Sequence, residues 1–145
     1  VGDKAFYATK CTDENGFACP MVMPKTVTKL DGQAFWGQDK SGNQIIVFKG
    51  NKPTSVQTSS LDTNDNGLNT LVVDAETYPD WLDSSEFTPV SELPEADVAK
   101  INLQLNSNPN YPGIKVLGKL STGTAGKYLN WITQLEQPLT MIIIR

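Results

Sequence analysis

The chain consists of short runs of β-branched, aromatic and aliphatic residues, and a turn signal ends each run within a few residues. The clearest runs are Gln44–Lys49, Leu71–Val73, Ile114–Leu120 and Tyr128–Leu135. Clusters of Gly, Pro, Asn, Asp and Ser separate the runs at intervals of roughly 8–12 residues, a spacing typical of antiparallel β domains. We therefore expect an all-β fold of antiparallel sheets, either a sandwich or a propeller-like arrangement, with long loops.

Three further segments add detail to this expected fold. Ala34–Gly37 and Gln44–Lys49 flank a Gly-containing turn and form the clearest predicted hairpin. Pro20 and Pro24 bracket a short apolar piece, which favours an edge strand because proline cannot donate a ladder hydrogen bond. Ser91–Lys100 has a cap candidate in Ser91, an early proline and acids near its start, so it predicts one short helix.

Length and composition indicate a single domain, residues 1–145, with an ordinary hydrophobic core. Hydrophobic residues make up 39% of the chain and charged residues 19%, as in soluble globular proteins. No apolar run approaches the ~20 residues of a membrane span. The closing run Met141–Ile144 is expected to be a buried strand. The chain starts at Val1 rather than Met, which predicts a processed N-terminus from which a signal peptide has been removed.

The chain contains no histidine, which excludes several kinds of catalytic and metal site. Ser-His-Asp and Cys-His nucleophile pairs and the usual His-bearing zinc sites cannot form. Asp62–Gly67 matches the opening of a calcium loop, but Val73 stands where the closing Glu belongs, so a turn is the favoured interpretation. Asp80 and Glu86 could serve glycoside cleavage, although any acid-rich loop offers such a pair. We expect no enzyme activity, no cofactor and no metal.

Charge is strongly segregated along the chain. Residues Pro53–Ala99 hold ten of the sixteen acidic residues and none of the twelve basic residues, although the net charge is only −4. Within this window, prolines predict that Asp74–Pro89 is a constrained loop rather than a regular element. It is either a solvated acidic face or a docking surface that steers a basic partner. An acidic surface argues against nucleic acid, because phosphates require basic side chains.

The predicted contact residues lie in the middle of this acidic loop. Trp81 has acids on both sides and is expected to be at least partly exposed, the setting of a binding hot spot, although a packing anchor is the alternative. Trp36 and Trp131 lie in predicted strands and are expected in the core. The two serines of the loop are either contact residues or turn formers. The predicted partner-binding residues are Asp80, Trp81, Asp83, Ser84, Ser85 and Glu86.

Cys11 and Cys19 enclose a short acidic segment that contains a glycine. A turn there could bring the two side chains together, so we predict a Cys11–Cys19 disulfide and an oxidising compartment. Two reduced thiols in a cytosolic protein are the alternative.

Two stretches, YATKCTDENGFACP and PDWLDSSEF, carry a resemblance to a known family. With them, this small, His-free and β-rich chain resembles periplasmic immunity proteins that neutralise peptidoglycan amidases delivered by type VI secretion. The resemblance implies a periplasmic inhibitor that occludes the Cys-His active site of such an effector. It also implies that a serine hydroxyl, here of Ser84 or Ser85, forms a hydrogen bond in that site. The alternatives are an extracellular glycan-binding β module and a glycoside-cleaving enzyme.

Overall fold

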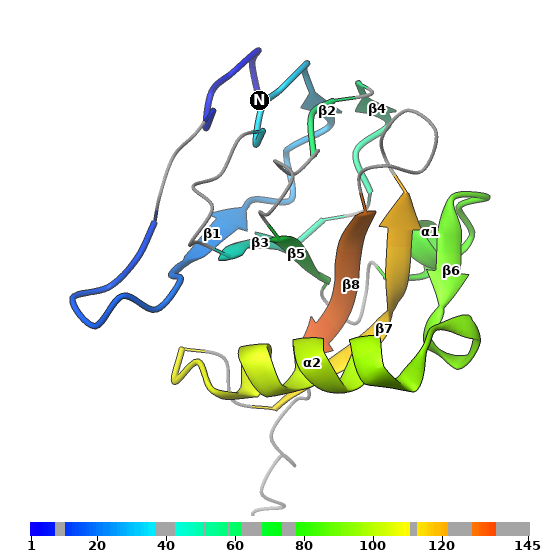
Figure 1. Ribbon diagram of the computed structural model, residues 1–145. Helices are drawn as coiled ribbons and strands as arrows, with labels where there is room; N and C mark the ends of the chain where they lie inside the picture. Colours follow the sequence, from blue (N-terminus) through cyan, green and yellow to red (C-terminus); the bar gives the residue numbers. More distant parts are fainter. Residues whose placement is uncertain are drawn as a thin grey trace, which may run out of the picture.

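The structure is a computed structural model that describes residues 1–7, 11–36, 43–50, 52–57, 59–61, 68–73, 78–110, 113–121 and 129–135. Its centre is a six-stranded sheet with the order β1-β3-β5-β8-β7-β6 (Figure 1). These strands are β1 (Pro20–Met23), β3 (Asn43–Phe48), β5 (Leu68–Val73), β8 (Leu129–Leu135), β7 (Ile114–Ser121) and β6 (Phe87–Pro89). A second, two-stranded sheet pairs β2 (Lys29–Leu30) with β4 (Ser55–Val56).

Three short helical segments complete the described fold. They are α1 (Tyr78–Leu82), the 3-10 helix η1 (Val90–Glu92) and α2 (Glu95–Asn106). None of the helices among the described residues is both long enough and apolar enough to cross a membrane.

The prediction of an all-β antiparallel fold is wrong, because the protein is mixed α/β. β1, β3, β5 and β8 run parallel to one another, and within the described part of this sheet antiparallel pairing is confined to β8–β7 and β7–β6. The predicted hairpin does not form, since β3 pairs with β1 and β5 and not with the segment around Ala34. Ala34 and Phe35 instead belong to a turn and are fully buried. Residues 37–42, which complete that predicted hairpin, lie outside the described residues.

The physical reason for the parallel arrangement is that the sheet is covered on both faces. Ile46 and Phe48 of β3 enter one core cluster, whereas Ile45 lies in the other. Neighbouring β5 divides in the same way, with Leu71 on one side and Val72 on the other. Strands that are buried on both faces have continuous apolar runs, and such strands are typical of parallel sheets in α/β proteins.

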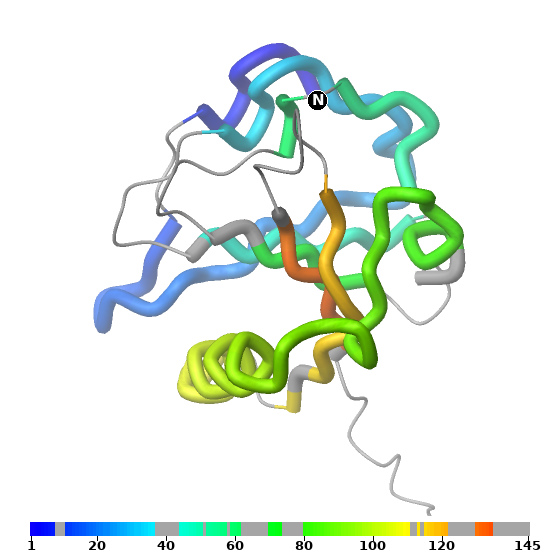
Figure 2. The backbone as a smooth tube through the Cα atoms, turned by 45° about the vertical axis from the view of Figure 1, so that its right-hand side comes forward, coloured from blue at the N-terminus to red at the C-terminus, as the bar shows by residue number. Residues whose placement is uncertain are grey.

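The two faces of the sheet are covered by different parts of the chain (Figure 2). On one face lies α2, whose buried Ile101 and Leu105 pack with Val116 and Trp131. On the opposite face lies the layer that contains β2 and β4, from which Leu30, Phe35 and Leu61 enter the core. The side chains named here are almost completely buried on both faces of the sheet.

Several local predictions can be compared directly with the structure. The Met21–Met23 piece is an edge strand, as predicted, because β1 ends the sheet. A helix is confirmed near Ser91–Lys100, but it runs further, to Asn106. Ser91 is not its cap. The residue before α2 is Pro94, which makes no side-chain cap hydrogen bond. The predicted strand Met141–Ile144 lies outside the described residues.

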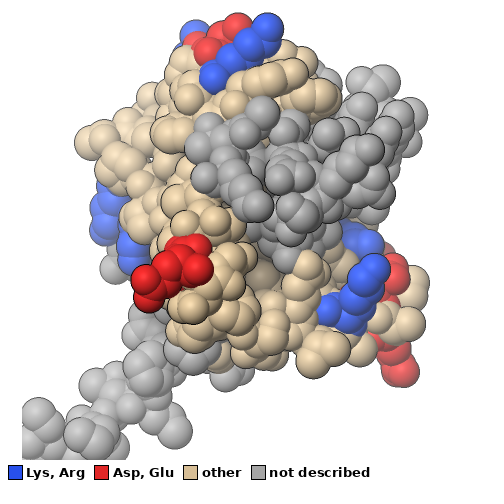
Figure 3. Space-filling model, turned by 60° about the vertical axis from the view of Figure 1, so that its left-hand side comes forward, with Lys and Arg blue, Asp and Glu red and all other residues tan. Residues whose placement is uncertain are grey.

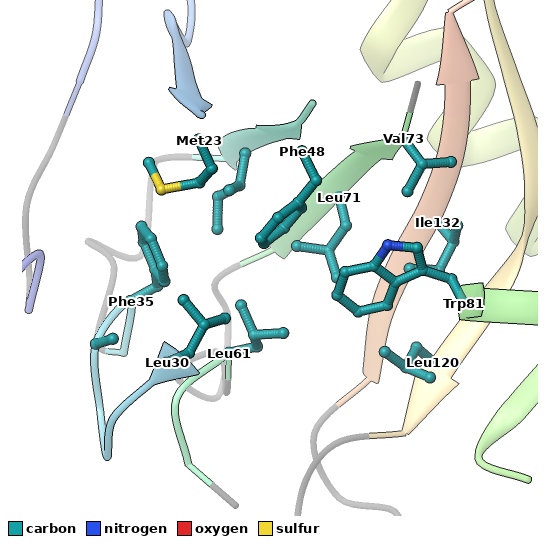
Figure 4. Packing of buried hydrophobic residues seen from close by; sticks show 12 residues of the cluster. Met23, Leu30, Phe35, Phe48, Leu61, Leu71, Val73, Trp81, Leu120 and Ile132 are labelled. Atoms are coloured by element: carbon teal, nitrogen blue, oxygen red, sulfur yellow. The ribbon is translucent and has the colours of Figure 1, made fainter. Parts of the chain in front are cut away.

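The indole ring of Trp81 is inserted from α1 into the core above the sheet. Figure 4 shows it among Val73, Leu120 and Ile132. Its centroid lies 5.1 Å from that of the Phe48 ring, and the two rings are tilted by 53°. The Trp81 side chain has an exposed fraction of 0%. A five-residue helix has too few internal hydrogen bonds to be stable alone, so this insertion is what holds α1 in place.

We expect Trp81→Ala to lower the free energy of unfolding by about 3–5 kcal/mol, because it removes a large buried ring and leaves a cavity. Urea unfolding followed by circular dichroism measures the loss. Leu103→Ala is the matched control, since Leu103 on α2 is 75% exposed and its truncation should change stability by less than about 0.5 kcal/mol. Equal effects of the two substitutions would contradict the anchoring role of Trp81.

Candidate functional site

The acidic part of the chain lies at the β6 edge of the sheet. α1, β6, η1 and the first turn of α2 follow one another there (Figure 1). The predicted constrained loop Asp74–Pro89 therefore contains two regular elements, α1 and β6, and residues 74–77 lie outside the described residues. The site can be described from Tyr78 onward.

Five carboxylates at this edge are exposed to solvent, and we call them the acidic edge. They are those of Asp80, Asp83, Glu86, Glu92 and Glu95. None of the five forms an ion pair with another described residue, and the ion pairs between described residues are Lys29–Asp31 and Lys119–Asp97. Among the described residues on the face that Figure 3 shows, by contrast, small groups of acidic and basic side chains stand apart from one another. The acidic edge is therefore a set of charges of one sign that has no neutralising partner among the described residues.

Trp81 does not belong to this surface, so the prediction that it is partly exposed is wrong. The residue is completely buried, and the Lys52 ammonium lies 5.7 Å from the centroid of its ring. Its indole N–H has no hydrogen-bond partner in the described structure. Acids flank Trp81 in sequence, but the helical turn of α1 directs the indole inward while Asp80 and Asp83 stay exposed. Trp81 thus positions the acidic edge without contacting anything outside the molecule.

The two serines of the acidic segment differ in their surroundings. The Ser84 hydroxyl oxygen accepts a hydrogen bond from the backbone N–H of Glu86 at 3.2 Å. The Ser84 N–H donates to the carbonyl of Trp81, and the Phe87 N–H donates to the carbonyl of Ser84. Ser84 therefore forms the turn between α1 and β6. Ser85 is exposed at the tip of that turn, and its hydroxyl makes no hydrogen bond with another described residue.

Gly118 of β7 allows β6 to approach closely enough to complete this edge. A side chain at Gly118 would collide with the backbone carbonyl of Thr88 and would lie 2.6 Å from Cζ of Phe87. A bulge between Val116 and Gly118 displaces the register of β7 at the same place. Because Gly118 has no Cβ, the Phe87 ring can lie directly over β7 and hold the acidic segment against the sheet.

A cleft on the α2 side of the sheet was not predicted from the sequence. We call it the α2 cleft, and its volume is about 200 Å³. It is lined by Asp97, Lys100, Ile101, Gln104, Lys119 and Trp131. The four α2 residues have the spacing of one helix face, but the pattern alone could not show which strands lie opposite. Neither Asp80 nor Glu86, the carboxylate pair considered for glycoside cleavage, lines this cleft.

Cys11 and Cys19 lie opposite each other, next to an isolated antiparallel bridge between Thr12 and Ala18. The Cys19 N–H donates to the carbonyl of Cys11 at 2.9 Å. Both side chains are free thiols in this structure, so the disulfide stays a prediction. Desolvation, the nearby charges of Cys11 and Asp13 and a hydrogen bond with Cys11 raise the pKa of the Cys19 thiol. A raised pKa keeps this thiol protonated at neutral pH and makes it a poor nucleophile.

The segment between the cysteines is fixed to the end of α2. The Asn108 amide donates to the carbonyl of Ala18 at 3.0 Å, and the Asn110 amide donates to a carboxylate oxygen of Asp13 at 3.1 Å. Desolvation acts to raise the pKa of Asp13, but hydrogen bonds from Phe17, Asn110 and nearby backbone N–H groups lower it below its usual value. Asp13 thus stays ionised and organises the segment.

The remaining site predictions concern metals and tryptophan. The calcium-like segment Asp62–Gly67 lies outside the described residues. Among the residues that the structure does describe, no group of three or more Cys, Asp or Glu side chains could hold a metal ion. Trp131 is buried, as predicted, whereas Trp36 is only partly buried and stacks on Tyr7 at 5.1 Å between centroids.

Comparison with known proteins gives no family assignment. No protein-family model matches the chain, and neither a curated protein sequence nor a solved structure matches it.

We expect mild oxidation to join Cys11 and Cys19, because their backbones are already paired. Closing so short a loop should raise the free energy of unfolding by about 2–3 kcal/mol on the chain-entropy estimate. Thermal unfolding with and without a reducing agent measures the difference, and mass spectrometry after digestion identifies the bonded peptide. A Cys11→Ser, Cys19→Ser variant should unfold at the same temperature in both conditions. No bonded peptide under oxidising conditions would contradict the prediction.

Proposed function

We propose that this protein is a non-enzymatic inhibitor that inserts its acidic edge into a positively charged groove of another protein. In its specific form, the proposal is a periplasmic immunity protein whose partner is a peptidoglycan amidase effector. The inhibitor occludes the Cys-His active site of the effector and so excludes the cell-wall substrate. The resemblance of PDWLDSSEF to such proteins gives the partner class, and the acidic edge gives the physical means of binding.

The observation that carries this proposal is that five exposed carboxylates share one short segment without ion-pair partners among the described residues. Exposed charges contribute little to the stability of a fold, even when they are paired. Charges of one sign at a protein edge do accelerate the encounter with an oppositely charged partner and select against like-charged ones. A basic groove rim is therefore the complementary partner surface.

Burial of Trp81 supports the proposal in a different way from an exposed hot spot. With its ring in the core and Phe87 over Gly118, the segment from α1 to β6 is fixed at both ends. A segment that is already ordered loses less conformational entropy when it binds. The contact surface is then made by the side chains between the two anchors, which are Asp83, Ser84, Ser85 and Glu86.

Within this surface, Ser85 is the hydroxyl that reaches the partner. The Ser84 oxygen already accepts the Glu86 N–H, whereas the Ser85 hydroxyl is exposed. A hydroxyl both donates and accepts, so it can satisfy a thiol and an imidazole in a groove from which water is excluded. The flanking carboxylates of Asp83 and Glu86 contact the basic rim.

The glycan-binding alternative has less support. A glycan-binding module would need exposed tryptophans on which sugar rings stack, but Trp81 and Trp131 are buried, and the partly buried Trp36 has one ring face against Tyr7. We therefore put forward one function only.

Affinity purification from a bacterial cell-envelope extract tests the proposed class of partner. The full chain is the bait, and captured proteins are identified by mass spectrometry and assayed for cleavage of purified peptidoglycan. We expect capture of a Cys/His amidase whose activity falls in proportion to the inhibitor added. Capture of an amidase that stays fully active in the saturated complex would refute occlusion, and failure to bind any peptidoglycan hydrolase would refute the partner class.

We expect Asp83→Lys with Glu86→Lys to slow association with that partner by about tenfold or more at low ionic strength. The reversal should also flatten the salt dependence of the association rate, because the steering charges are lost. Surface plasmon resonance over a salt series measures both quantities. Asp3→Lys with Glu14→Lys is the matched control, since it makes the same change in net charge at exposed positions outside the acidic edge. Equal slowing by both pairs would show that only net charge matters.

A further inference from the structure

The α2 cleft contains an arrangement of charges that the proposed inhibitor function does not use. The Lys119 ammonium lies 3.6 Å from a carboxylate oxygen of Asp97 and 4.5 Å from the centroid of the Trp131 ring. Its side chain is only 16% exposed. Lys100 adds a second ammonium to the same cleft and forms no ion pair with another described residue. Two positive groups and one negative group thus border one cleft, which has Ile101 and Trp131 as apolar lining.

We propose that the α2 cleft binds a free α-amino acid in its zwitterionic form. The carboxylate of the amino acid lies between Lys100 and Lys119, and its ammonium faces Asp97. Gln104, on the next turn of α2, offers an amide that can donate or accept one further hydrogen bond.

The mixed signs in the cleft favour a zwitterion over an ion of one sign. A simple anion would gain from the two lysines but would meet the Asp97 carboxylate, which already lies beside Lys119. A simple cation would gain from Asp97 but would meet both ammoniums. An α-amino acid presents opposite charges one carbon atom apart, so it can satisfy both sets together. Charge-assisted hydrogen bonds of this kind are roughly twice as strong as neutral ones.

The size and position of the cleft support a small ligand. Its volume of about 200 Å³ is below the roughly 300–1,000 Å³ of sites that accept drug-sized molecules. The walls come from one helix and two adjacent strands that are packed through Ile101, Val116 and Trp131, so the site is formed before the ligand arrives. Its residues do not include the five carboxylates of the acidic edge, and the proposal holds whether or not the inhibitor function is correct.

A calorimetric titration tests this proposal with the full chain. The twenty standard amino acids are first screened by thermal shift, and the best binder is then titrated beside its N-acetyl and amide derivatives. The N-acetyl form lacks the ammonium, and the amide form lacks the carboxylate. We expect the free amino acid to bind at least about tenfold more tightly than either derivative, because each has lost one charge-assisted contact. Equal binding of either derivative, or no binding by any amino acid, would overturn the proposal.

Variants of the lining lysines locate the binding. Lys100→Gln and Lys119→Gln should each weaken binding by about tenfold or more. Lys115→Gln is the matched control, because Lys115 is an exposed lysine of β7 that does not line the cleft. Lys119 also contacts Asp97 and Trp131, so its loss could disturb the fold, whereas Lys100 is exposed and its variant should fold normally. Unchanged affinity of a folded Lys100→Gln variant would overturn the assignment.

Discussion

The insertion of the Trp81 ring into the core determines where the charged surface of this protein lies. α1 has five residues, too few for a helix that is stable without tertiary contacts. Burying an aromatic ring of this size contributes several kcal/mol, far more than a single exposed ion pair. Because the ring packs between β3, β5, β7 and β8, the residues on either side of it must emerge at the β6 edge.

The insertion of the Trp81 ring explains how the segment from α1 to β6 can be both acidic and well ordered. Like charges placed close together repel one another, and the repulsion opposes compact structure. Here the segment is held by apolar contacts at both ends, through Trp81 in the core and Phe87 over Gly118. The carboxylates themselves remain in water, where repulsion is weak because the effective dielectric constant is high. Their charges therefore remain at the solvent-exposed surface.

The sequence predicted the positions of many elements but misjudged how they pair. Runs such as Ile45-Ile46-Val47-Phe48 were correctly predicted as strands, yet their apolar residues are consecutive rather than alternating. Consecutive apolar residues indicate a strand buried on both faces, which favours parallel pairing with a covering helix. The Gly-containing turn signal after Gly37 favoured an antiparallel hairpin instead. Such turns are also found in connections between parallel strands, so the signal does not decide between the two kinds of pairing. Pairing depends on contacts far apart in the chain, which local patterns do not contain.

Local sequence patterns also limited what could be predicted about the candidate sites. The acids of the 80–86 stretch were predicted to form a solvated face or a docking surface, and the structure places Asp80, Asp83 and Glu86 at the surface. The two serines were predicted to be either contact residues or turn formers, and Ser84 forms a turn whereas Ser85 is exposed. The prediction for Trp81 was wrong because its acidic neighbours in sequence suggested an exposed loop. The helical turn of α1 instead directs the indole ring into the core and leaves the neighbouring carboxylates at the surface.

The α2 cleft could not be predicted, since Lys119 approaches Asp97 only after β7 packs beside α2. The Lys119–Asp97 ion pair also separates the acidic edge from the α2 cleft. Asp97 is the last acid of the Pro53–Ala99 window, and because it pairs with Lys119 the acidic edge ends at Glu95. A cleft of mixed charge therefore lies next to a surface of one sign.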